Sequence, residues 1–219
     1  EIPYTPLTLL GHGQKGVVEK VRHAHSSAIY ARKTYRLSPR SARQRALDRA
    51  AYVREIEITR RLQKHRHIVR VVASYSTSDT LAVILEPAAD GGDLKTYLAR
   101  YAAGDVETRR DMQRTLYHAY GCLASGLAFM HSQRIRHRDV KPENILVHGT
   151  EVLFADFGIS RDYSGKADSW TDGRADAFTA KYCAPEVQDQ GVRSSRSDVW
   201  ALGCVFLLLY SAVWESDVI

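Results

Sequence analysis

Cysteine is scarce in this sequence, and the few cysteines lie far apart. Cys122, Cys183 and Cys204 are the only three among 219 residues, and none belongs to a CxxC pair. Disulfide frameworks and zinc sites usually show paired or closely spaced cysteines. We therefore expect neither of them. The pattern fits a reducing compartment, which predicts an intracellular protein of the cytoplasm or nucleus.

Long apolar runs are also lacking. The most apolar segment, Val199 to Trp214, contains Gly203 and Ser211. It has about 16 residues, whereas a membrane-spanning helix needs about 20. We expect a buried core helix there and no membrane partner. The sequence begins without methionine and without a basic and apolar leader, so we expect no secretory signal and a chain cut from a longer one.

Neither sign of charge dominates the composition. Charged residues make up 26% of the chain and hydrophobic residues 44%, which is usual for a globular protein of one or two domains. The net charge of +6 fits anionic partners such as nucleic acid, a membrane surface or nucleotide phosphates. The densest basic run, Arg54 to Arg70, carries no zinc-finger or RNP pattern. We favour a solvated basic surface and no nucleic-acid partner.

The first part of the chain has the pattern of strands and one helix. Apolar and β-branched runs bounded by turn residues predict five strands. These are Leu7–Leu10, Val17–Val21, Ala28–Tyr35, Ile68–Ala73 and Leu81–Leu85. Ser38 before Pro39 predicts the start of a helix that runs to about Lys64.

The second part is richer in helices. After a hinge at Glu86–Ala89, apolar residues at three- and four-residue steps predict a short helix from Leu94 and a long one over Met112–Met130. Two short strands and a polar loop follow. We place them at Ile145–Val147, Val152–Phe154 and Ile159–Lys181. There is no internal repeat.

Two polar motifs in this second part carry the chemistry. Residues 137–144 read HRDVKPEN and residues 156–158 read DFG, with apolar runs around both. Asp139 can accept the proton of an incoming hydroxyl, and Lys141 can stabilise a phosphoryl group. Asn144 and Asp156 offer the oxygen ligands that Mg²⁺ prefers. A surface ion cluster is the plain alternative, but every role of a phosphoryl-transfer site is filled, and we favour that site.

A glycine-rich turn lies near the N-terminus. Gly11, His12, Gly13 and Gly16 belong to the string GHGQKG, and Val18 follows. Glycines let a backbone approach phosphates closely, although a plain hairpin turn is the simpler interpretation of so weak a pattern. A strand rather than a helix is expected next, which argues against a dinucleotide-binding fold. The string suits a flap over a nucleotide, with Val18 against the base.

Lys33 lies in the middle of an expected strand among apolar neighbours. An inward lysine there needs a charged partner, whereas an outward lysine would be solvated, and the tripeptide alone leaves both open. If it points inward, Glu55 is the better partner, because Glu57 falls on the exposed face of the helix.

Asp93 and the histidines are less specific. Asp93 follows a double glycine and can bond a ribose hydroxyl, cap the helix from Leu94, or do both. His12, His65 and His67 have no metal-ligand spacing with acidic residues, so we interpret them as surface residues.

Taken together, these motifs resemble the catalytic domain of eukaryotic protein kinases. They occur in that family's order from Gly11 to about Trp214, with ARK at 31–33, APE at 184–186 and DVWALG at 198–203. The resemblance implies an α+β fold of two lobes forming one kinase domain. Residues 1–88 would form a small antiparallel sheet lobe with one main helix. Residues 89–219 would form a mostly helical catalytic lobe that lacks its last helices.

The resemblance also implies ATP and Mg²⁺ as cofactors and assigns residues to them. The implied catalytic residues are Asp139, Lys141, Lys33, Glu55 and Thr179. The implied nucleotide-binding residues are Gly11, His12, Gly13, Gly16, Val18, Ala31, Lys33, Leu85, Glu86, Ala88, Asp93, Asn144 and Asp156, of which Asn144 and Asp156 would also bind the metal. By the same resemblance, Leu85 is the gatekeeper, and Glu86 and Ala88 offer backbone groups to adenine. Lys141 and Thr179 look like the serine/threonine class, and Asp198 would anchor the catalytic loop.

Regulation and substrate choice follow from the resemblance in outline only. Arg138 would pair with a phosphate on the loop after DFG, and Ser169 or Thr171 is the expected phosphorylation site. Glu143 and Asp93 match positions that contact basic residues ahead of the phosphoacceptor.

Three features depart from the family's pattern. Thr59 stands where a large apolar residue is usual, and Phe178 where glycine is common. The sequence also ends soon after the helix from Asp198, without the arginine that normally pairs with Glu186. We expect an apolar helix such as Val205–Tyr210 to lose part of its cover, and a partner or a missing segment to cover it.

Three functions compete at this point. The first is a serine/threonine protein kinase, a transferase that moves the γ-phosphate of ATP to a protein Ser or Thr hydroxyl. The second is a truncated, inactive kinase-fold binding or scaffold protein. The third is a kinase-like enzyme for a small molecule, which the APE segment and Thr179 disfavour. We favour the first.

Overall fold

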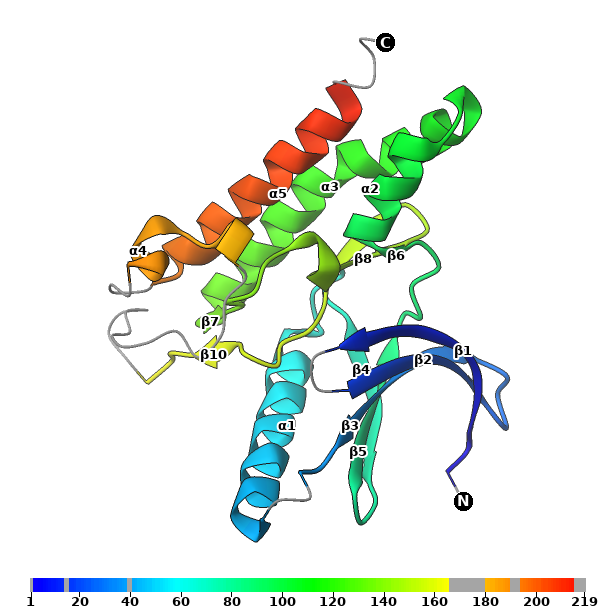
Figure 1. Cartoon of the computed structure of the whole chain (residues 1–219), viewed down its shortest axis with the longest axis vertical. Helices are drawn as coiled ribbons and strands as arrows, with labels where there is room; N and C mark the ends of the chain where they lie inside the picture. The colour runs from blue at the N-terminus through cyan, green and yellow to red at the C-terminus, as the bar shows by residue number, and fades with distance from the viewer. Residues whose placement is uncertain (1, 14–15, 39–40, 166–179, 190–193, 215–219) are drawn as a thin grey trace.

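The computed structural model describes residues 2–13, 16–38, 41–165, 180–189 and 194–214. They form two lobes, a β-sheet with one helix beside it and a mostly helical part (Figure 1). The described elements are β1 (Tyr4–Gly13), β2 (Gly16–His23), β3 (Ile29–Arg36), α1 (Ala42–Leu62), β4 (Arg70–Ser76), β5 (Thr80–Glu86), β6 (Gly92–Asp93), α2 (Leu94–Ala103), α3 (Val106–Ser132), β7 (Ile135–Arg136), η1 (Pro142–Asn144), β8 (Ile145–His148), β9 (Glu151–Phe154), β10 (Arg161–Asp162), η2 (Ala180–Tyr182), α4 (Pro185–Gln188) and α5 (Arg196–Trp214). The predicted α+β fold with a sheet lobe and a helical lobe is confirmed.

The sheet of the first lobe is antiparallel throughout, with strand order β1-β2-β3-β5-β4. Each of the five predicted strands is present, with ends that differ by a few residues. Lys33 lies opposite Val18 on one side and Val83 on the other, and Ala31 lies opposite Leu85. The sheet therefore places Lys33 at its centre, on the strand next to the glycine-rich hairpin.

Helix α1 starts later than the sequence indicated. Ser41, and not Ser38, is its N-cap, and the Ser41 side chain accepts a hydrogen bond from the Gln44 amide at 3.1 Å. Such a cap satisfies one of the amides that the first helical turn leaves unpaired. The Ser38 amide instead donates to Asp48 at 3.0 Å, ahead of the helix. The prediction from Ser38-Pro39 was therefore wrong by about one turn.

The helical lobe is organised around α3. Its apolar side chains at three- and four-residue spacing are buried, including Leu116 and Leu123 at 0% exposure. Helices α2 and α5 pack against it, and β8 and β9 lie on another side. The same core includes Leu62 and Ile68, which come from the end of α1 and the turn after it. The end of α1 is therefore anchored in the helical lobe, and the sheet lobe has a smaller core of its own.

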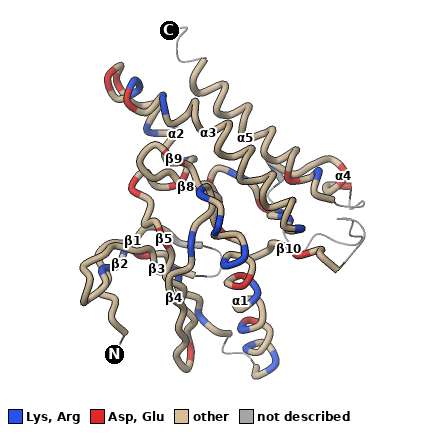
Figure 2. The backbone as a smooth tube through the Cα atoms, turned by 180° about the vertical axis from the view of Figure 1, so that it is seen from behind, with Lys and Arg blue, Asp and Glu red and all other residues tan. Residues whose placement is uncertain are grey.

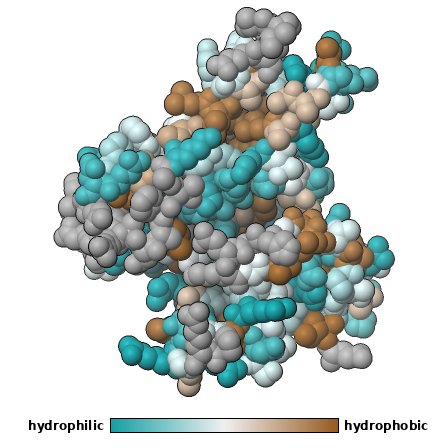
Figure 3. Space-filling model, viewed as in Figure 1, coloured by the Kyte–Doolittle hydropathy of each residue, from teal (hydrophilic) through white to brown (hydrophobic). Residues whose placement is uncertain are grey.

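Helix α5 has two faces of different environment. Val205 and Leu209 are fully buried, whereas Leu207 is 70% exposed and Tyr210 is 55% exposed. Apolar atoms gather over the upper part of this helix in the space-filling view (Figure 3). By length and composition the helix could cross a membrane, and a third of its most apolar stretch is buried. The expected burial of this segment is thus confirmed for one face only.

Positive charge is concentrated on α1 more than the sequence suggested. Lysine and arginine recur along this helix and the turn that follows it (Figure 2). The arginines of α1 are Arg43, Arg45, Arg49, Arg54, Arg60 and Arg61. The last of these pairs with Asp162 of β10 at 2.7 Å, which ties the end of α1 to the helical lobe.

Candidate active site

A buried carboxylate fixes the backbone of residues 137–144, called the HRD segment below. Asp198 of α5 is 3% exposed and accepts the amides of His137 at 2.8 Å and Arg138 at 2.7 Å. His131 lies 3.0 Å from the same carboxylate. Burial raises the pKa of Asp198, but the contact with His131 and the two amides outweighs it and lowers this pKa below its ordinary value. The carboxylate is therefore ionised and holds the loop that precedes Asp139.

His137 joins this loop to the DFG segment. Its Nδ1 accepts the Asp139 amide at 3.3 Å, so Nε2 carries the hydrogen and donates to the Ala155 carbonyl at 3.1 Å. The His137 ring also contacts the buried Phe157, with ring centroids 5.0 Å apart. One imidazole therefore holds two chain segments that both supply polar side chains to the site.

Asp139 lies in contact with two of the other HRD-segment residues. Its Oδ2 accepts Asn144 Nδ2 at 2.8 Å and lies 2.8 Å from Lys141 Nζ. Asn144 Nδ2 also donates to the Asp139 carbonyl at 2.8 Å. Because the Asn144 amide nitrogen is used in this way, its side-chain oxygen is left available as a ligand atom.

Lys33 points inward, and the two sequence interpretations are thereby decided. Its Nζ lies 3.0 Å from Glu55 Oε1 and 2.8 Å from Asp156 Oδ1, and its side chain is 13% exposed. Burial lowers the pKa of Lys33, but the negative charges of Glu55 and Asp156 and the nearby Tyr35 hydroxyl raise it well above its ordinary value. Glu57 is exposed, as the sequence predicted. Three segments far apart in the sequence therefore meet at one ammonium.

Asp156 remains ionised beside this ammonium. Burial raises its pKa, but the charge and hydrogen bond of Lys33 outweigh that effect and lower it. Its backbone has φ of 63°, in the left-handed region, and Oδ1 also accepts the Gly158 amide at 3.4 Å. Oδ2 makes no hydrogen bond within the described part of the chain. The carboxylate thus keeps one oxygen for a cation.

Tyr35 belongs to the site and was missed from the sequence. Its hydroxyl donates to Glu55 Oε1 at 2.7 Å, and burial raises its pKa far above its ordinary value. The ring lies beside Lys33, whose Nζ is 5.1 Å from the ring centroid. Lys33 and Tyr35 are two apart on β3 and so share a face. Once Lys33 is known to point inward, this alternation predicts that Tyr35 points inward too.

The glycine-rich string forms the end of the β1–β2 hairpin. Gly11 lies opposite Val18, His12 opposite Val17, and Gly13 opposite Gly16. A Cβ atom on Gly16 would lie 1.9 Å from the Thr34 carbonyl oxygen, so only glycine fits there. A Cβ atom on Gly11 would have no neighbouring atom within 4 Å. The requirement for glycine is thus steric at Gly16.

The hinge residues Glu86 and Ala88 are partly buried, and Glu86 pairs with Arg70 at 2.8 Å.

Asp93 caps α2, because its side chain accepts a hydrogen bond from the Thr96 amide at 2.8 Å. The cap that the sequence predicted is present, and a ribose contact stays a prediction. Thr179, Phe178, Ser169 and Thr171 lie outside the described residues.

Three further expectations are resolved by local contacts. Thr59 is 4% exposed, and its hydroxyl donates to the Glu55 carbonyl at 2.7 Å, so its polar atom is satisfied inside the helix. Glu186 accepts a hydrogen bond from Ser197 at 3.0 Å. The interpretation of His67 as a surface residue was wrong, since it is 6% exposed.

Comparison with known proteins shows the family to which the chain belongs. The model of the protein kinase domain matches residues 4–215. This chain belongs to the protein kinase family. Cyclin-dependent kinase 4 of Mus musculus is 36% identical over 216 residues, which cover 94% of this chain and 67% of that protein. Serine/threonine-protein kinase H2 of Homo sapiens is 32% identical over 219 residues, covering 98% of this chain and 52% of that protein.

Membership of the kinase family implies ATP and Mg²⁺ in general, and the donor set fits them. Hard oxygen ligands suit Mg²⁺. Asn144 keeps its side-chain oxygen and Asp156 keeps Oδ2, as described above. The Asn144 carbonyl accepts the Ala155 amide at 2.9 Å, which brings these two segments together. The two residues that the sequence nominated as metal ligands therefore lie on neighbouring segments, Asn144 at the end of η1 and Asp156 two residues after β9.

Proposed function

We propose that the chain is a serine/threonine protein kinase that transfers the γ-phosphate of ATP to a Ser or Thr hydroxyl of a protein. The observation that carries this proposal is the position of Asp139. Its Oδ2 contacts both Asn144 and Lys141, in a loop that Asp198 anchors. A carboxylate set between an amide and an ammonium is oriented to receive a proton, and the ammonium is placed to stabilise the phosphoryl group.

In the proposed step the substrate hydroxyl oxygen forms a bond to the γ-phosphorus while the bond to the β–γ bridging oxygen breaks. The hydroxyl proton passes to Asp139, and ADP leaves with the bridging oxygen. Bound Mg²⁺ would neutralise charge on the phosphate oxygens, with Asn144 and Asp156 as its protein ligands. Lys33, which Glu55 and Tyr35 orient, would contact the phosphates of ATP.

The remaining assignments are part of the same proposal. Residues 1–88 would act as the nucleotide-binding lobe and residues 89–219 as the catalytic and substrate lobe. The hairpin with Gly11, Gly13 and Gly16 would cover the phosphates, and Leu85, Glu86 and Ala88 would lie against adenine. Thr179 would contact Asp139, and the protein would act inside the cell.

Glu143 supports a preference for basic residues in the substrate. Its Oε1 accepts Lys95 Nζ at 3.0 Å, while its buried Oε2 has no hydrogen-bond partner within the described chain. A substrate arginine ahead of the phosphoacceptor would supply that partner. A peptide array should therefore favour upstream arginine, and an array without any preference for basic residues would remove this part of the proposal.

Transfer of labelled phosphate from ATP tests the proposed reaction. Asp139→Asn preserves the shape of the side chain but removes the base, so incorporation into a protein substrate should fall about 10²- to 10⁴-fold. Asp111→Asn is the matched control, because Asp111 is an exposed aspartate of α3 in the same lobe. Equal incorporation by the wild type and Asp139→Asn would end the proposal for this chain.

A binding protein with a kinase fold is the second candidate. The exposed apolar face of α5, with Leu207 at 70% and Trp214 at 50% exposure, is the observation that favours it. No ATP-dependent incorporation above the Asp139→Asn background, in a correctly folded chain, would support this candidate over the first.

A further inference from the structure

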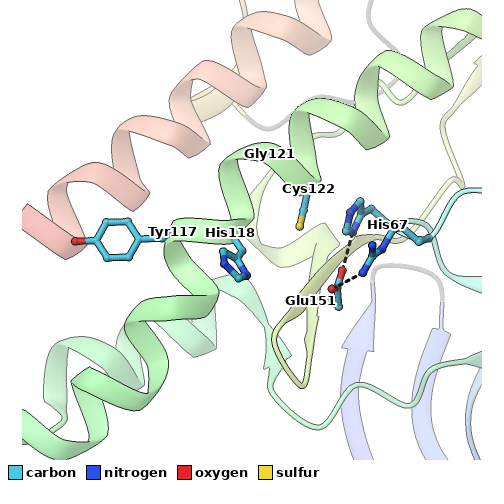
Figure 4. A pocket seen from close by; sticks show the side chains of 7 residues that line it. His67, Tyr117, His118, Gly121, Cys122 and Glu151 are labelled. Atoms are coloured by element: carbon cyan, nitrogen blue, oxygen red, sulfur yellow. Dashed lines mark hydrogen bonds and ion pairs between the residues drawn. The ribbon is translucent and has the colours of Figure 1, made fainter.

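A pocket with a volume of about 480 Å³ lies beside α3, and none of its lining residues belongs to the site described above. Its lining residues are Arg66, His67, Tyr117, His118, Gly121, Cys122 and Glu151. In the close-up view, the side chains of His67, Cys122 and Glu151 point toward one another (Figure 4). They come from the turn after α1, from the middle of α3 and from the first residue of β9.

These three side chains offer a compact set of ligand atoms. One ring nitrogen of His67, the Cys122 sulfur and one carboxylate oxygen of Glu151 all lie within 4.8 Å of one another. A tetrahedral zinc ion with ligands at about 2.0–2.3 Å needs ligand atoms roughly 3.3–3.8 Å apart. The set therefore needs a contraction of roughly 1–1.5 Å, which rotations of the three side chains can provide.

The local polar contacts leave room for a cation. Glu151 Oε1 pairs with Arg66 at 2.6 Å, but the buried Oε2 has no hydrogen-bond partner within the described chain. Oε2 lies 3.3 Å from His67 Nδ1, which is also 3.1 Å from the Val152 carbonyl. Because a carbonyl only accepts, Nδ1 carries the hydrogen in this contact, and Nε2 becomes a metal ligand once the imidazole turns Nε2 toward Glu151 and Cys122.

Zinc binding requires a neutral imidazole and a deprotonated thiol. A neutral imidazole binds metal directly, while the thiol loses its proton to solvent as the metal–sulfur bond forms.

We propose that His67, Cys122 and Glu151 form a zinc-binding site. Nitrogen, sulfur and carboxylate ligands favour Zn²⁺ over Mg²⁺, which takes oxygen ligands, so this site is chemically distinct from the one that Asn144 and Asp156 form. The fourth position faces the pocket and is filled by water. His118 lies one helical turn before Cys122 on α3 and lines the same pocket.

The proposed ion would join three segments of the helical lobe. Backbone hydrogen bonds already connect the turn after α1 to β9, from Phe154 N to His67 O at 2.9 Å and from Val69 N to Phe154 O at 3.1 Å. Zinc would add Cys122 and thereby link this turn covalently to α3. Because the turn directly follows α1, we infer that zinc binding stabilises the base of the helix that carries Glu55.

Sequence patterns gave no sign of this site. The three residues are far apart in the chain, and zinc motifs are recognised by short spacings between ligands. The fold alone brings them together, and for this reason the sequence predicted no zinc site.

Zinc uptake by the full chain tests the proposal. Protein stripped of metal with a chelator is dialysed against Zn²⁺, and metal content is measured by mass spectrometry, with Co²⁺ as a second probe whose thiolate band reports a metal–sulfur bond. The variants are Cys122→Ser and Glu151→Gln. Cys204→Ser is the matched control, since Cys204 is an equally half-buried free cysteine on α5. Arg66→Gln is a second control, because it removes the Glu151 ion pair but keeps all three ligands.

We expect one zinc per chain in the wild type, in Cys204→Ser and in Arg66→Gln, and binding at least ~10-fold weaker in the two ligand variants. The cobalt complex should show a thiolate band that Cys122→Ser lacks. The melting temperature should rise with zinc in the wild type and not in the ligand variants. Absence of zinc uptake by the folded wild type, or equal uptake by Cys122→Ser, would overturn the proposal. Circular dichroism checks folding, and Glu151→Gln alone decides if Cys122→Ser does not fold.

Discussion

Tyr35 donates its hydroxyl hydrogen to the same Glu55 oxygen that pairs with Lys33. The hydroxyl lies 2.7 Å from that oxygen and the Lys33 ammonium lies 3.0 Å from it. One carboxylate oxygen therefore accepts from a neutral donor and a charged donor at once. Glu55 is therefore held by a hydrogen bond from Tyr35 in addition to its ion pair with Lys33.

Tyr35→Phe should weaken this arrangement without disturbing the sheet. A hydrogen bond to a charged group contributes about 1.5–3 kcal/mol, so we expect the free energy of unfolding to fall by about that amount, measured by urea denaturation. Tyr30→Phe on the same strand is the matched control, because no hydrogen bond of the Tyr30 hydroxyl occurs within the described chain, and it should change stability by less than ~0.5 kcal/mol. Equal effects of the two variants would show that the Tyr35–Glu55 bond contributes nothing.

Glu55→Gln should reduce activity more than Glu57→Gln. The first change removes the charge that pairs with Lys33, while Glu57 is exposed on the other face of α1. If the charged hydrogen bond contributes about 1.5–3 kcal/mol to positioning Lys33, kcat/KM for ATP should fall roughly 10- to 150-fold. Steady-state kinetics on both variants checks this. A loss in Glu57→Gln as large as in Glu55→Gln would contradict the assigned pairing.

Asp198 should make the fold sensitive to acid. Its folded pKa is lower than its ordinary value, so its stabilising contribution is present above about pH 4 and is lost as the pH falls through the folded pKa. Asp198→Asn should therefore unfold more readily than the wild type at pH 7. The difference should shrink as the pH falls below about 4, because Asp198 of the unfolded chain then takes up a proton that the folded carboxylate takes up only at lower pH. Denaturation curves at several pH values test this, and a difference independent of pH would exclude the titration of Asp198 as the cause.

Site residues that lie close together in the chain could be predicted from the sequence. Residues whose orientation depends on the packing of distant elements could not. Asp139 and Asn144 lie close in the chain, so one motif could nominate both of them, although their hydrogen bond was not predicted. Lys33 needed the sheet and α1 to be placed before its orientation was decided. Thr59 looked unfavourable because a large apolar residue is usual at its position in the family. Its hydroxyl donates to a carbonyl of its own helix, and a comparison of residue types at one position does not reveal that hydrogen bond.

Element boundaries show the same division. The strands followed from apolar runs bounded by turn residues, but the start of α1 depended on which of two serines accepts a hydrogen bond from a helix amide. Ser41 does so through a single side-chain hydrogen bond. Such a bond contributes about 1 kcal/mol, which is too small a difference for composition to reveal.

Gly16 provides the sharpest steric test of the hairpin. A Cβ atom there would lie 1.9 Å from the Thr34 carbonyl oxygen, which is backbone and has little freedom to move. Gly16→Ala should therefore displace β2 from β3 and lower the free energy of unfolding by about 1–3 kcal/mol. Gly11→Ala on the paired strand meets nothing within 4 Å and is the matched control, with a change of less than ~0.5 kcal/mol expected. Because Gly16 borders the proposed phosphate-binding turn, the KM for ATP should also rise more in Gly16→Ala than in Gly11→Ala. Equal stability of the two variants would mean that the hairpin adapts to a side chain at Gly16, and the steric argument for glycine at that position would then be wrong.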